Sequence, residues 1–198
     1  MTASSVFPLE GGCDCRHVRY RMETAPLFVH CCHCRWCQRE SGASFALNAM
    51  IEADRVTVMG GEPELNDTPS ASGYGQKFAR CPQCRIALWS NYAGAGPLIR
   101  FVRVGTLDLP DHLPPDIHIF TASKQPWVVI PQGRPAVPEY YEREKHWPAE
   151  SLVRRQADPQ RLAVGRQFLY SRDHGRPGLR QSDCRSAAWC ARLFRAAA

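Results

Sequence analysis

Clustered cysteines constrain this sequence more than any other feature. The chain has 198 residues and ten cysteines, eight of which fall into three short groups. These groups are Cys13 with Cys15, Cys32, Cys34 and Cys37 with the adjacent Cys31, and Cys81 with Cys84. Two thiolates that are one to four residues apart can occupy neighbouring corners of a zinc tetrahedron, at Zn–S distances of about 2.3 Å. The spacing therefore predicts a fold organised around metal ligands.

The start of the chain and its hydropathy predict a cytoplasmic protein. Residues 1–12 have neither the basic start nor the apolar run of a secretory signal. No stretch approaches the roughly 18 uncharged apolar residues of a membrane helix, so we expect no membrane segment. In a reducing cytosol, clustered cysteines are more often metal ligands or catalytic thiolates than disulfides.

The sizes of the three groups predict two unequal metal sites. The four thiols of the two pairs can close one structural site, whereas a group of three leaves one position open to water or substrate. The expected ligands are Cys13, Cys15, Cys81 and Cys84 for the closed site and Cys32, Cys34 and Cys37 for the open site. We expect two zinc ions per chain, one structural and one catalytic.

Other interpretations of the thiols remain open. A redox C-x-x-C pair usually begins a helix in a βαβ context, and an iron–sulfur cluster would draw four thiolates from one group. Alternation along a strand points Cys31 away from Cys32, so we interpret Cys31 as a small buried residue. His33 could coordinate a metal or form a hydrogen bond. Cys184 and Cys190 are too far apart for a zinc knuckle and are interpreted as incidental thiols.

Short apolar runs between turn residues predict a mainly β fold, an antiparallel sandwich or small barrel. The expected strand segments are 18–22, 45–51, 56–58, 86–89, 99–104, 117–120 and 127–130. The polar, turn-rich stretch 61–76 is expected to be a mobile excursion between two strands. Helices are expected only as the short pieces Cys34 to Glu40, Glu139 to Trp147, and Ala149 to Ala157, the last of which follows Pro148.

The charge distribution separates the end of the chain from the rest. Residues 1–150 carry 15 Lys and Arg against 16 Asp and Glu, whereas residues 151–198 carry 10 Arg, no Lys and 3 Asp. The excess positive charge therefore gives no basic face within the folded part, and nucleic-acid binding is not expected. We interpret residues 1–157 as a zinc-binding domain and expect residues 158–198 to be a flexible Arg-rich extension.

The cysteine groups lie within four longer segments that together resemble a known family. These segments are GGCDCRHVRY at 11–20, CHCRWCQRESGASF at 32–45, CPQCRIALWS at 81–90, and VGTLD followed by HIFTASKQPWVVIP within 104–131. Their order and spacing resemble the glutathione-dependent formaldehyde-activating enzyme family, which includes centromere protein V. The resemblance covers roughly residues 7–147.

The resemblance implies a small zinc-binding β-sandwich or β-tent fold, with a structural four-thiolate zinc and a catalytic three-thiolate zinc. It also implies a carbon–sulfur lyase that adds glutathione to formaldehyde and gives S-(hydroxymethyl)glutathione. The catalytic residues would then be Cys32, Cys34 and Cys37, and the partners a thiol, glutathione or an analogue, and an aldehyde. The alternative is a non-enzymatic zinc module that binds a protein or nucleic acid.

The chain departs from the family at two matching positions. Family members usually carry Gly after the second cysteine of each structural pair, where this chain has Arg16 and Arg85. Because such a Gly commonly has a positive φ, the turns could be reshaped. The two arginines could instead offset part of the charge of a four-thiolate site, or be exposed without any role at the metal.

Several residues outside the cysteine groups are candidates for contact with a substrate. Glutathione has two carboxylates, so basic side chains near the group of three cysteines are of interest. The candidates are Arg35, Arg39 and Lys124. Trp36, Trp89 and Trp127 could line a pocket or pack in the core, and His118 could act as an acid or base or be an ordinary strand residue.

Overall fold

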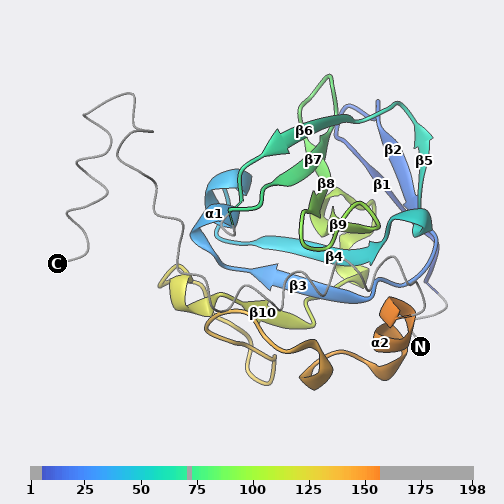
Figure 1. Ribbon diagram of the computed structural model, residues 1–198. Helices are drawn as coiled ribbons and strands as arrows, with labels where there is room; N and C mark the ends of the chain where they lie inside the picture. Colours follow the sequence, from blue (N-terminus) through green and yellow to red (C-terminus); the bar gives the residue numbers. More distant parts are fainter. Residues whose placement is uncertain (1–5, 71–72, 157–198) are drawn as a thin grey trace, which may run out of the picture. The chain divides into compact units, whose positions relative to one another are not determined.

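The computed structural model describes residues 6–70 and 73–156 as a mainly β fold with two short helices (Figure 1). The strands are β1 (Leu9–Gly12), β2 (Arg19–Met22), β3 (Phe28–Cys32), β4 (Ala46–Glu52), β5 (Val56–Gly60), β6 (Glu64–Thr68), β7 (Gln76–Arg80), β8 (Ala87–Tyr92), β9 (Ile99–Arg103) and β10 (Ile117–Ile119). The helices are α1 (Arg35–Ser41) and α2 (Ala149–Gln156). Short 3-10 turns lie at Ala53–Arg55, Val104–Thr106, Pro110–His112, Thr121–Ser123 and Arg143–Lys145. The prediction of a mainly β fold with short helices is confirmed.

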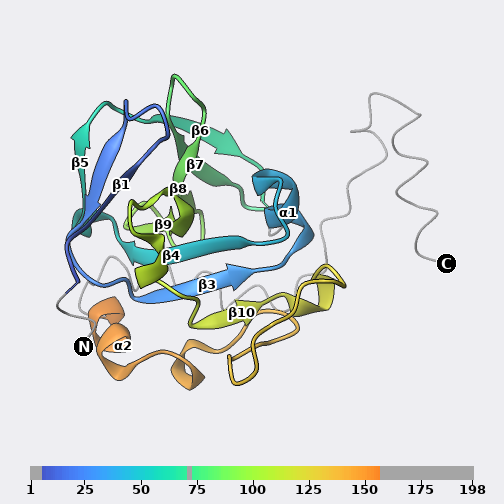
Figure 2. The same cartoon turned by 180° about the vertical axis from the view of Figure 1, so that it is seen from behind.

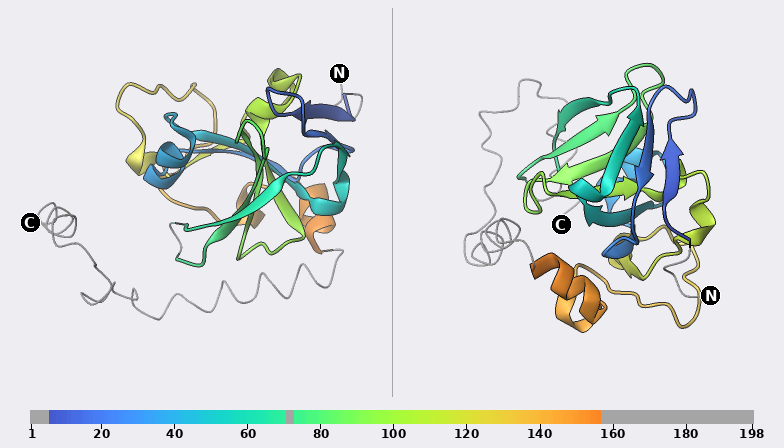
Figure 3. Two further views of the ribbon diagram at one scale, coloured as in Figure 1. Left: turned by 90° about the horizontal axis from the view of Figure 1, so that it is seen from above. Right: turned by 90° about the vertical axis from the view of Figure 1, so that its right-hand side faces the viewer.

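The strands form two sheets. A three-stranded antiparallel sheet has the order β1-β2-β5, and a seven-stranded sheet has the order β10-β3-β4-β9-β8-β7-β6. In the larger sheet β10 pairs with β3 in parallel, whereas the other neighbours are antiparallel. The smaller sheet lies beside the part of the larger one that contains β7 and β8 (Figures 1 and 3). This arrangement brings the turn between β1 and β2 close to the turn between β7 and β8.

Strand β3 lies at the boundary between two apolar clusters, and all of its residues are buried. Phe28 and Cys32 point to a cluster that includes Trp147 of the C-terminal segment. Val29 points to the opposite face, into a cluster that includes Tyr20 and Trp89. Because successive side chains of a strand point to opposite faces, neighbouring residues of β3 face different environments.

The segment after β10 covers its outer side (Figure 2). The Phe120 N–H donates to the Glu139 carbonyl and the Val137 N–H to the His118 carbonyl, both at 2.9 Å. The segment ends in α2, which begins directly after Pro148, as expected. The described part of the chain ends at Gln156, so the expected extension 158–198 lies outside the described residues.

An ion pair fixes α2 to the larger sheet. The Glu52 carboxylate, at the end of β4, is 1% exposed and accepts two hydrogen bonds from Arg154, at 2.7 and 3.2 Å. A third Arg154 nitrogen donates to the Ala25 carbonyl at 3.0 Å. The guanidinium thus neutralises the carboxylate and also donates two hydrogen bonds to it, although the carboxylate has almost no access to water.

The described part of the polar stretch 61–76 contains a paired strand, so the prediction of an excursion was wrong there. Within it, Glu64–Thr68 forms the edge strand β6, which pairs with β7 in an antiparallel register. The strand is polar because it lies at the edge of the sheet, and its residues are exposed or only half-buried.

The expected strand 127–130 was also wrong, since these residues form turns and irregular structure. Trp127 is 71% and Val129 86% exposed. Pro126 and Pro131 flank the segment and lack the N–H groups that a sheet would need. The expected helix from Glu139 to Trp147 is reduced to a single 3-10 turn.

Neither helix of residues 6–70 and 73–156 is long and apolar enough to cross a membrane.

Replacing Arg154 with Ala tests the attachment of α2. We expect the free energy of unfolding to fall by about 3 kcal/mol, because the substitution leaves the buried Glu52 carboxylate without its closest cation. Urea unfolding followed by tryptophan fluorescence measures the change. The matched control is Val153→Ala on the exposed side of the same helix, which should change stability by less than about 0.5 kcal/mol. Equal stability of the two variants would contradict the importance of the ion pair.

Candidate metal centre

Four thiols from two turns converge between the sheets. Cys13 and Cys15 lie in the turn between β1 and β2, and Cys81 and Cys84 lie in the turn between β7 and β8. The Cys15 Sγ lies 3.4 Å from that of Cys13 and 3.6 Å from that of Cys81, and all four sulfurs are within 4.8 Å of one another. Sulfur ligands at the corners of a zinc tetrahedron are about 3.8 Å apart. The structure therefore brings together the four residues expected in the closed site, with spacing that fits a metal ion.

The two turns share one backbone design. The Arg16 N–H donates to the Cys13 carbonyl and the Arg85 N–H to the Cys81 carbonyl, both at 3.0 Å. Arg16 has φ 60° and Arg85 has φ 65°, the left-handed conformation that favours glycine. This conformation costs a residue with a Cβ about 1 kcal/mol or more. The turns are thus not reshaped, and the arginines adopt the conformation expected of glycine.

The side chain of Arg85 is engaged elsewhere. It forms an ion pair with Glu64 of β6, so its charge is directed to that carboxylate. At the sulfurs themselves, the Val18 N–H donates to Cys13 Sγ at 3.3 Å. Backbone N–H groups of this kind stabilise thiolates without a charged side chain. The contacts of Arg85 therefore do not support a role in offsetting the charge of the four thiolates.

The second group of thiols lies at the junction between β3 and α1, and we refer to Cys32, Cys34 and Cys37 as the triplet. Cys32 ends β3, Cys34 is the N-cap of α1 and accepts the Cys37 N–H at 3.4 Å, and Cys37 lies in the first turn of the helix. Their sulfurs lie within 4.8 Å of one another, without a fourth Cys, His or acidic ligand in the group among the described residues. Cys32 and Cys37 are buried, whereas Cys34 is half-buried.

The triplet has the chemistry of a metal site. Contacts with Cys32 and Cys37 lower the pKa of Cys34, whereas contacts with Cys34 and Cys37 raise the pKa of Cys32. Three thiols this close therefore cannot all ionise unless a cation neutralises them. Three sulfur donors suit zinc, and Cys32 and Cys37 belong to a buried apolar cluster against which Cys34 packs. The donor set fits zinc with one further coordination position.

Polar residues that no motif marks lie beside the triplet. Burial, followed by the negative charge at Cys37 and Cys32, raises the pKa of Tyr92, so its hydroxyl stays protonated. Glu40 of α1 forms ion pairs with both Arg80 and Arg103, and its side chain is only 7% exposed. These contacts hold α1 against β7 and β9. The sequence gives no local signal for them because the residues come from distant segments.

The face of β3 opposite Cys32 holds three other residues that the sequence singled out, namely Cys31, His33 and His118. The Nε2 atom of His33 is 3.0 Å from Nδ1 of His118 and 3.5 Å from Sγ of Cys31. Cys31 is buried, as expected. The parallel register pairs His118 with Cys31 and Ile119 with Cys32, so His118 does not share a face with Cys32. His118 is therefore not an acid or base of the triplet in this geometry.

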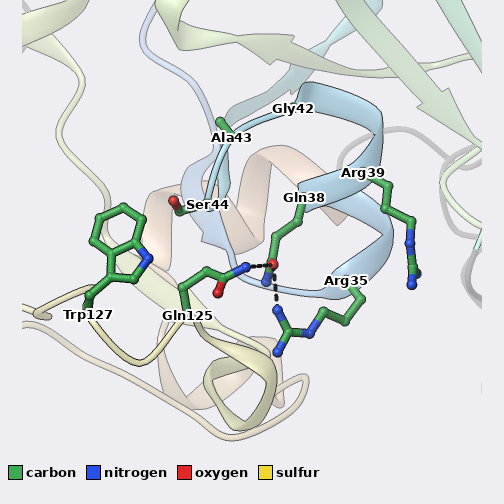
Figure 4. Close-up of a pocket in the computed structure, with 8 residues that line it drawn as sticks. All are labelled: Arg35, Gln38, Arg39, Gly42, Ala43, Ser44, Gln125 and Trp127. Atoms are coloured by element: carbon green, nitrogen blue, oxygen red, sulfur yellow. Dashed lines mark hydrogen bonds between the residues drawn. The ribbon is translucent and has the colours of Figure 1, made fainter.

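A pocket of about 630 Å³ lies along α1 (Figure 4). Its wall includes Arg35, Gln38 and Arg39 of the helix, with Gln125 and Trp127 on the facing loop. Gln38 Oε1 accepts hydrogen bonds from Arg35 at 2.8 Å and from Gln125 at 2.9 Å. The helix residues of the wall share one face of α1, and Cys37 points to the other side. None of the triplet cysteines lines this pocket.

The remaining substrate candidates divide between surface and interior. Arg35 and Arg39 are exposed, whereas the Lys124 ammonium donates to the carbonyls of Gln125 and Val128, at 3.2 and 2.7 Å. Lys124 therefore stabilises its own loop. Of the tryptophans, Trp89 is core, Trp36 stacks on Phe78, and Trp127 lines the pocket.

Comparisons with known proteins place these observations in a family context. The sequence model described as glutathione-dependent formaldehyde-activating enzyme matches residues 8–123, more than half of the chain. No curated protein matches the chain. A solved structure of a Rhodobacter sphaeroides protein, a structural genomics target, is 22% identical, covers 50% of this chain and 88% of that chain, and has a TM-score of 0.40.

Substituting Cys81 with Ser tests the closed site. The four thiols join turns separated by about 65 residues, and closing a loop of that length costs roughly 4 kcal/mol in chain entropy. We expect Cys81→Ser to lose one metal equivalent and at least about 4 kcal/mol of stability, because metal binding and folding are coupled. Elemental analysis and thermal unfolding measure the two effects. Wild-type metal content and melting temperature in this variant would contradict the site.

Proposed function

The chain belongs to the glutathione-dependent formaldehyde-activating enzyme family, and from this premise we propose that it is a zinc-dependent carbon–sulfur lyase. The proposed reaction joins the sulfur of glutathione, or of a related thiol, to the carbon of formaldehyde. The thiol proton ends on the former carbonyl oxygen, and the reverse reaction restores both reactants. We assign the activity to the domain at residues 1–157.

The triplet is the observation that carries this proposal. Three sulfurs lie within 4.8 Å of one another, while the thiol group between the sheets has four. A three-ligand set leaves a position that a substrate can occupy, whereas a four-ligand set is closed. We therefore propose that Cys32, Cys34 and Cys37 form the catalytic site and that Cys13, Cys15, Cys81 and Cys84 form the structural site, each holding one zinc ion.

The residues around the triplet suit this chemistry. A zinc ion held by the three thiolates would stabilise the ionised form of a substrate thiol at neutral pH. Half-buried Cys34 marks the side from which a substrate can approach, since Cys32 and Cys37 are covered. The apolar cluster around them limits access of water. We propose the Tyr92 hydroxyl, whose pKa is raised by burial and by the nearby thiols Cys37 and Cys32, as the hydrogen-bond donor for the oxygen of the aldehyde.

Two arginines of α1 provide charge for the carboxylates of glutathione. Arg35 and Arg39 are exposed on the helix that carries Cys37, and both line the pocket beside it. We propose that the pocket binds a carboxylate end of the substrate while the thiol reaches the triplet around the start of α1.

Exchange NMR tests the activity. Formaldehyde and glutathione combine spontaneously, so the exchange rate between free and adduct signals is measured with and without the protein. We expect faster exchange with the zinc-loaded protein than in its absence. An unchanged rate with fully loaded protein would support the non-enzymatic zinc module instead.

Cys34→Ser separates catalysis from folding. The triplet spans six residues and closes little chain entropy, so we expect the variant to keep its strand content and the other thiol site. It should lose one zinc equivalent and nearly all exchange activity. Circular dichroism, elemental analysis and exchange NMR are compared with Cys184→Ser, which removes a thiol outside the triplet and should keep full activity. Unfolding of Cys34→Ser as severe as that of Cys81→Ser would make the triplet structural.

Arg35→Ala and Arg39→Ala test the binding of the substrate carboxylates. We expect each substitution to raise KM for glutathione about tenfold, as the loss of one charge-assisted contact predicts, and to leave kcat nearly unchanged. The same variants should turn over 2-mercaptoethanol, a thiol without carboxylates, like the wild type. The control is Lys77→Ala, an exposed cation of β7 that pairs with Asp67. Equal loss for both thiols would place the arginines outside carboxylate binding.

A further inference from the structure

A second set of potential metal ligands lies on the face of β3 opposite the triplet. Cys31 and His33 lie two residues apart and point to the same side, and the parallel pairing with β10 brings His118 opposite Cys31. One ligand atom from each of the three residues lies within 4.8 Å of the others. The set contains one sulfur and two imidazole nitrogens and shares no residue with the two thiol groups.

The distances between these atoms match the edges of a metal tetrahedron. The Cys31 Sγ to His33 Nε2 distance is 3.5 Å, and the His33 Nε2 to His118 Nδ1 distance is 3.0 Å. For zinc with Zn–S of about 2.3 Å and Zn–N of about 2.05 Å, tetrahedral angles give edges of about 3.6 Å and 3.3 Å. The shorter nitrogen–nitrogen edge corresponds to a ligand–metal–ligand angle of about 95°, for the same Zn–N distance. Two edges of the set therefore fit one metal ion, and the third, between Cys31 and His118, is at most 4.8 Å.

Each histidine of this buried set has one ring nitrogen within the cluster and one outside it. His33 is 0%, Cys31 2% and His118 6% exposed. Within the part of the chain that the structure describes, His33 Nδ1 and His118 Nε2 have no hydrogen-bond partner. A single His–His hydrogen bond satisfies only one nitrogen of each ring and leaves the thiol as a weak partner. A metal held by His33 Nε2 and His118 Nδ1 would leave these two outer nitrogens as N–H groups, so the metal ion is inferred from the convergence of the three buried inner donors and not from the unpartnered atoms.

We propose that Cys31, His33 and His118 bind a third metal ion, a borderline transition-metal cation such as zinc. Imidazole nitrogen and thiolate are both ligands of this class, and two neutral histidines with one thiolate leave a single net positive charge on a divalent ion. The Cys31 thiol releases its proton to solvent when the ion binds. The ion would link β3 to β10 on the face of β3 opposite Cys32.

The site stands apart from the proposed lyase activity. Its ligands lie on the other face of β3 from Cys32, and burial of all three residues leaves no open route to a substrate as large as glutathione. We therefore assign it a structural role, in which the metal fixes the register of the parallel pair. A parallel pair of three residues at the edge of a sheet has few backbone hydrogen bonds of its own.

Metal counting tests the site on the full chain. All variants carry Cys184→Ala and Cys190→Ala, so that thiols outside the described residues do not contribute. Each protein is equilibrated with zinc, freed of loosely bound ions, and analysed for zinc and sulfur. Relative to this parent, Cys31→Ala and His118→Gln should each contain one zinc fewer. Val29→Ala, a substitution of another buried residue on the same face of β3, should retain the parental content.

Cobalt(II) supplies an independent readout. The difference spectrum between the cobalt-loaded parent and Cys31→Ala should show tetrahedral cobalt with a single thiolate-to-metal charge-transfer contribution. Circular dichroism checks that Cys31→Ala, a small change in side-chain volume, keeps the fold even if His118→Gln does not. The proposal is overturned if Cys31→Ala keeps the parental metal content, or if a folded His118→Gln does. Because the result is a difference of one equivalent, it does not depend on whether the triplet holds metal or is catalytic.

Discussion

The convergence of two thiol-bearing turns is the constraint on which the rest of the fold depends. Cys13 and Cys15 belong to the smaller sheet and Cys81 and Cys84 to the larger one, so their contact fixes the sheets relative to each other. Between these sheets lies the apolar cluster that contains Tyr20 and Trp89. Arg16 and Arg85 adopt the left-handed conformation in these turns although it is unfavourable for a residue with a Cβ. A metal ion bound by these four thiols would add stability to a small β domain, whose apolar core is limited in size.

Strand β3 contributes a cysteine to the set of potential metal ligands on each of its two faces. Its alternation sends Cys32 to the face that α1 completes with Cys34 and Cys37, and sends Cys31 to the face shared with His118. Since both faces are covered, each set of donors lies in apolar surroundings where thiolates need a cation. The half-buried position of Cys34 distinguishes the triplet from the buried set on the other face. A difference in access, more than in ligand type, therefore separates a proposed catalytic site from a proposed structural one.

The cysteine groups could be predicted from sequence because their geometry is local. Spacings of one or two residues determine which sulfurs can share a metal, and the structure brings together both expected sets. The short helix after Cys34 and the helix after Pro148 follow from similarly local signals. The positions of His118, Tyr92 and Glu40 could not be predicted, because they depend on which strands pair and in which register. Strand β6 was missed because an edge strand can be polar on both faces, and residues 127–130 were misread because apolar residues between prolines imitate a strand.

Anomalous diffraction from crystals of the full chain, recorded on both sides of the zinc absorption edge, tests the central claim most directly. The account predicts one zinc peak surrounded by the sulfurs of Cys13, Cys15, Cys81 and Cys84, and another bound by Cys32, Cys34 and Cys37 with a fourth ligand that is not a protein side chain. Zn–S distances of about 2.3 Å are expected at both. Disulfides in place of these contacts, an iron rather than a zinc edge, or a fourth protein ligand at the triplet would contradict it.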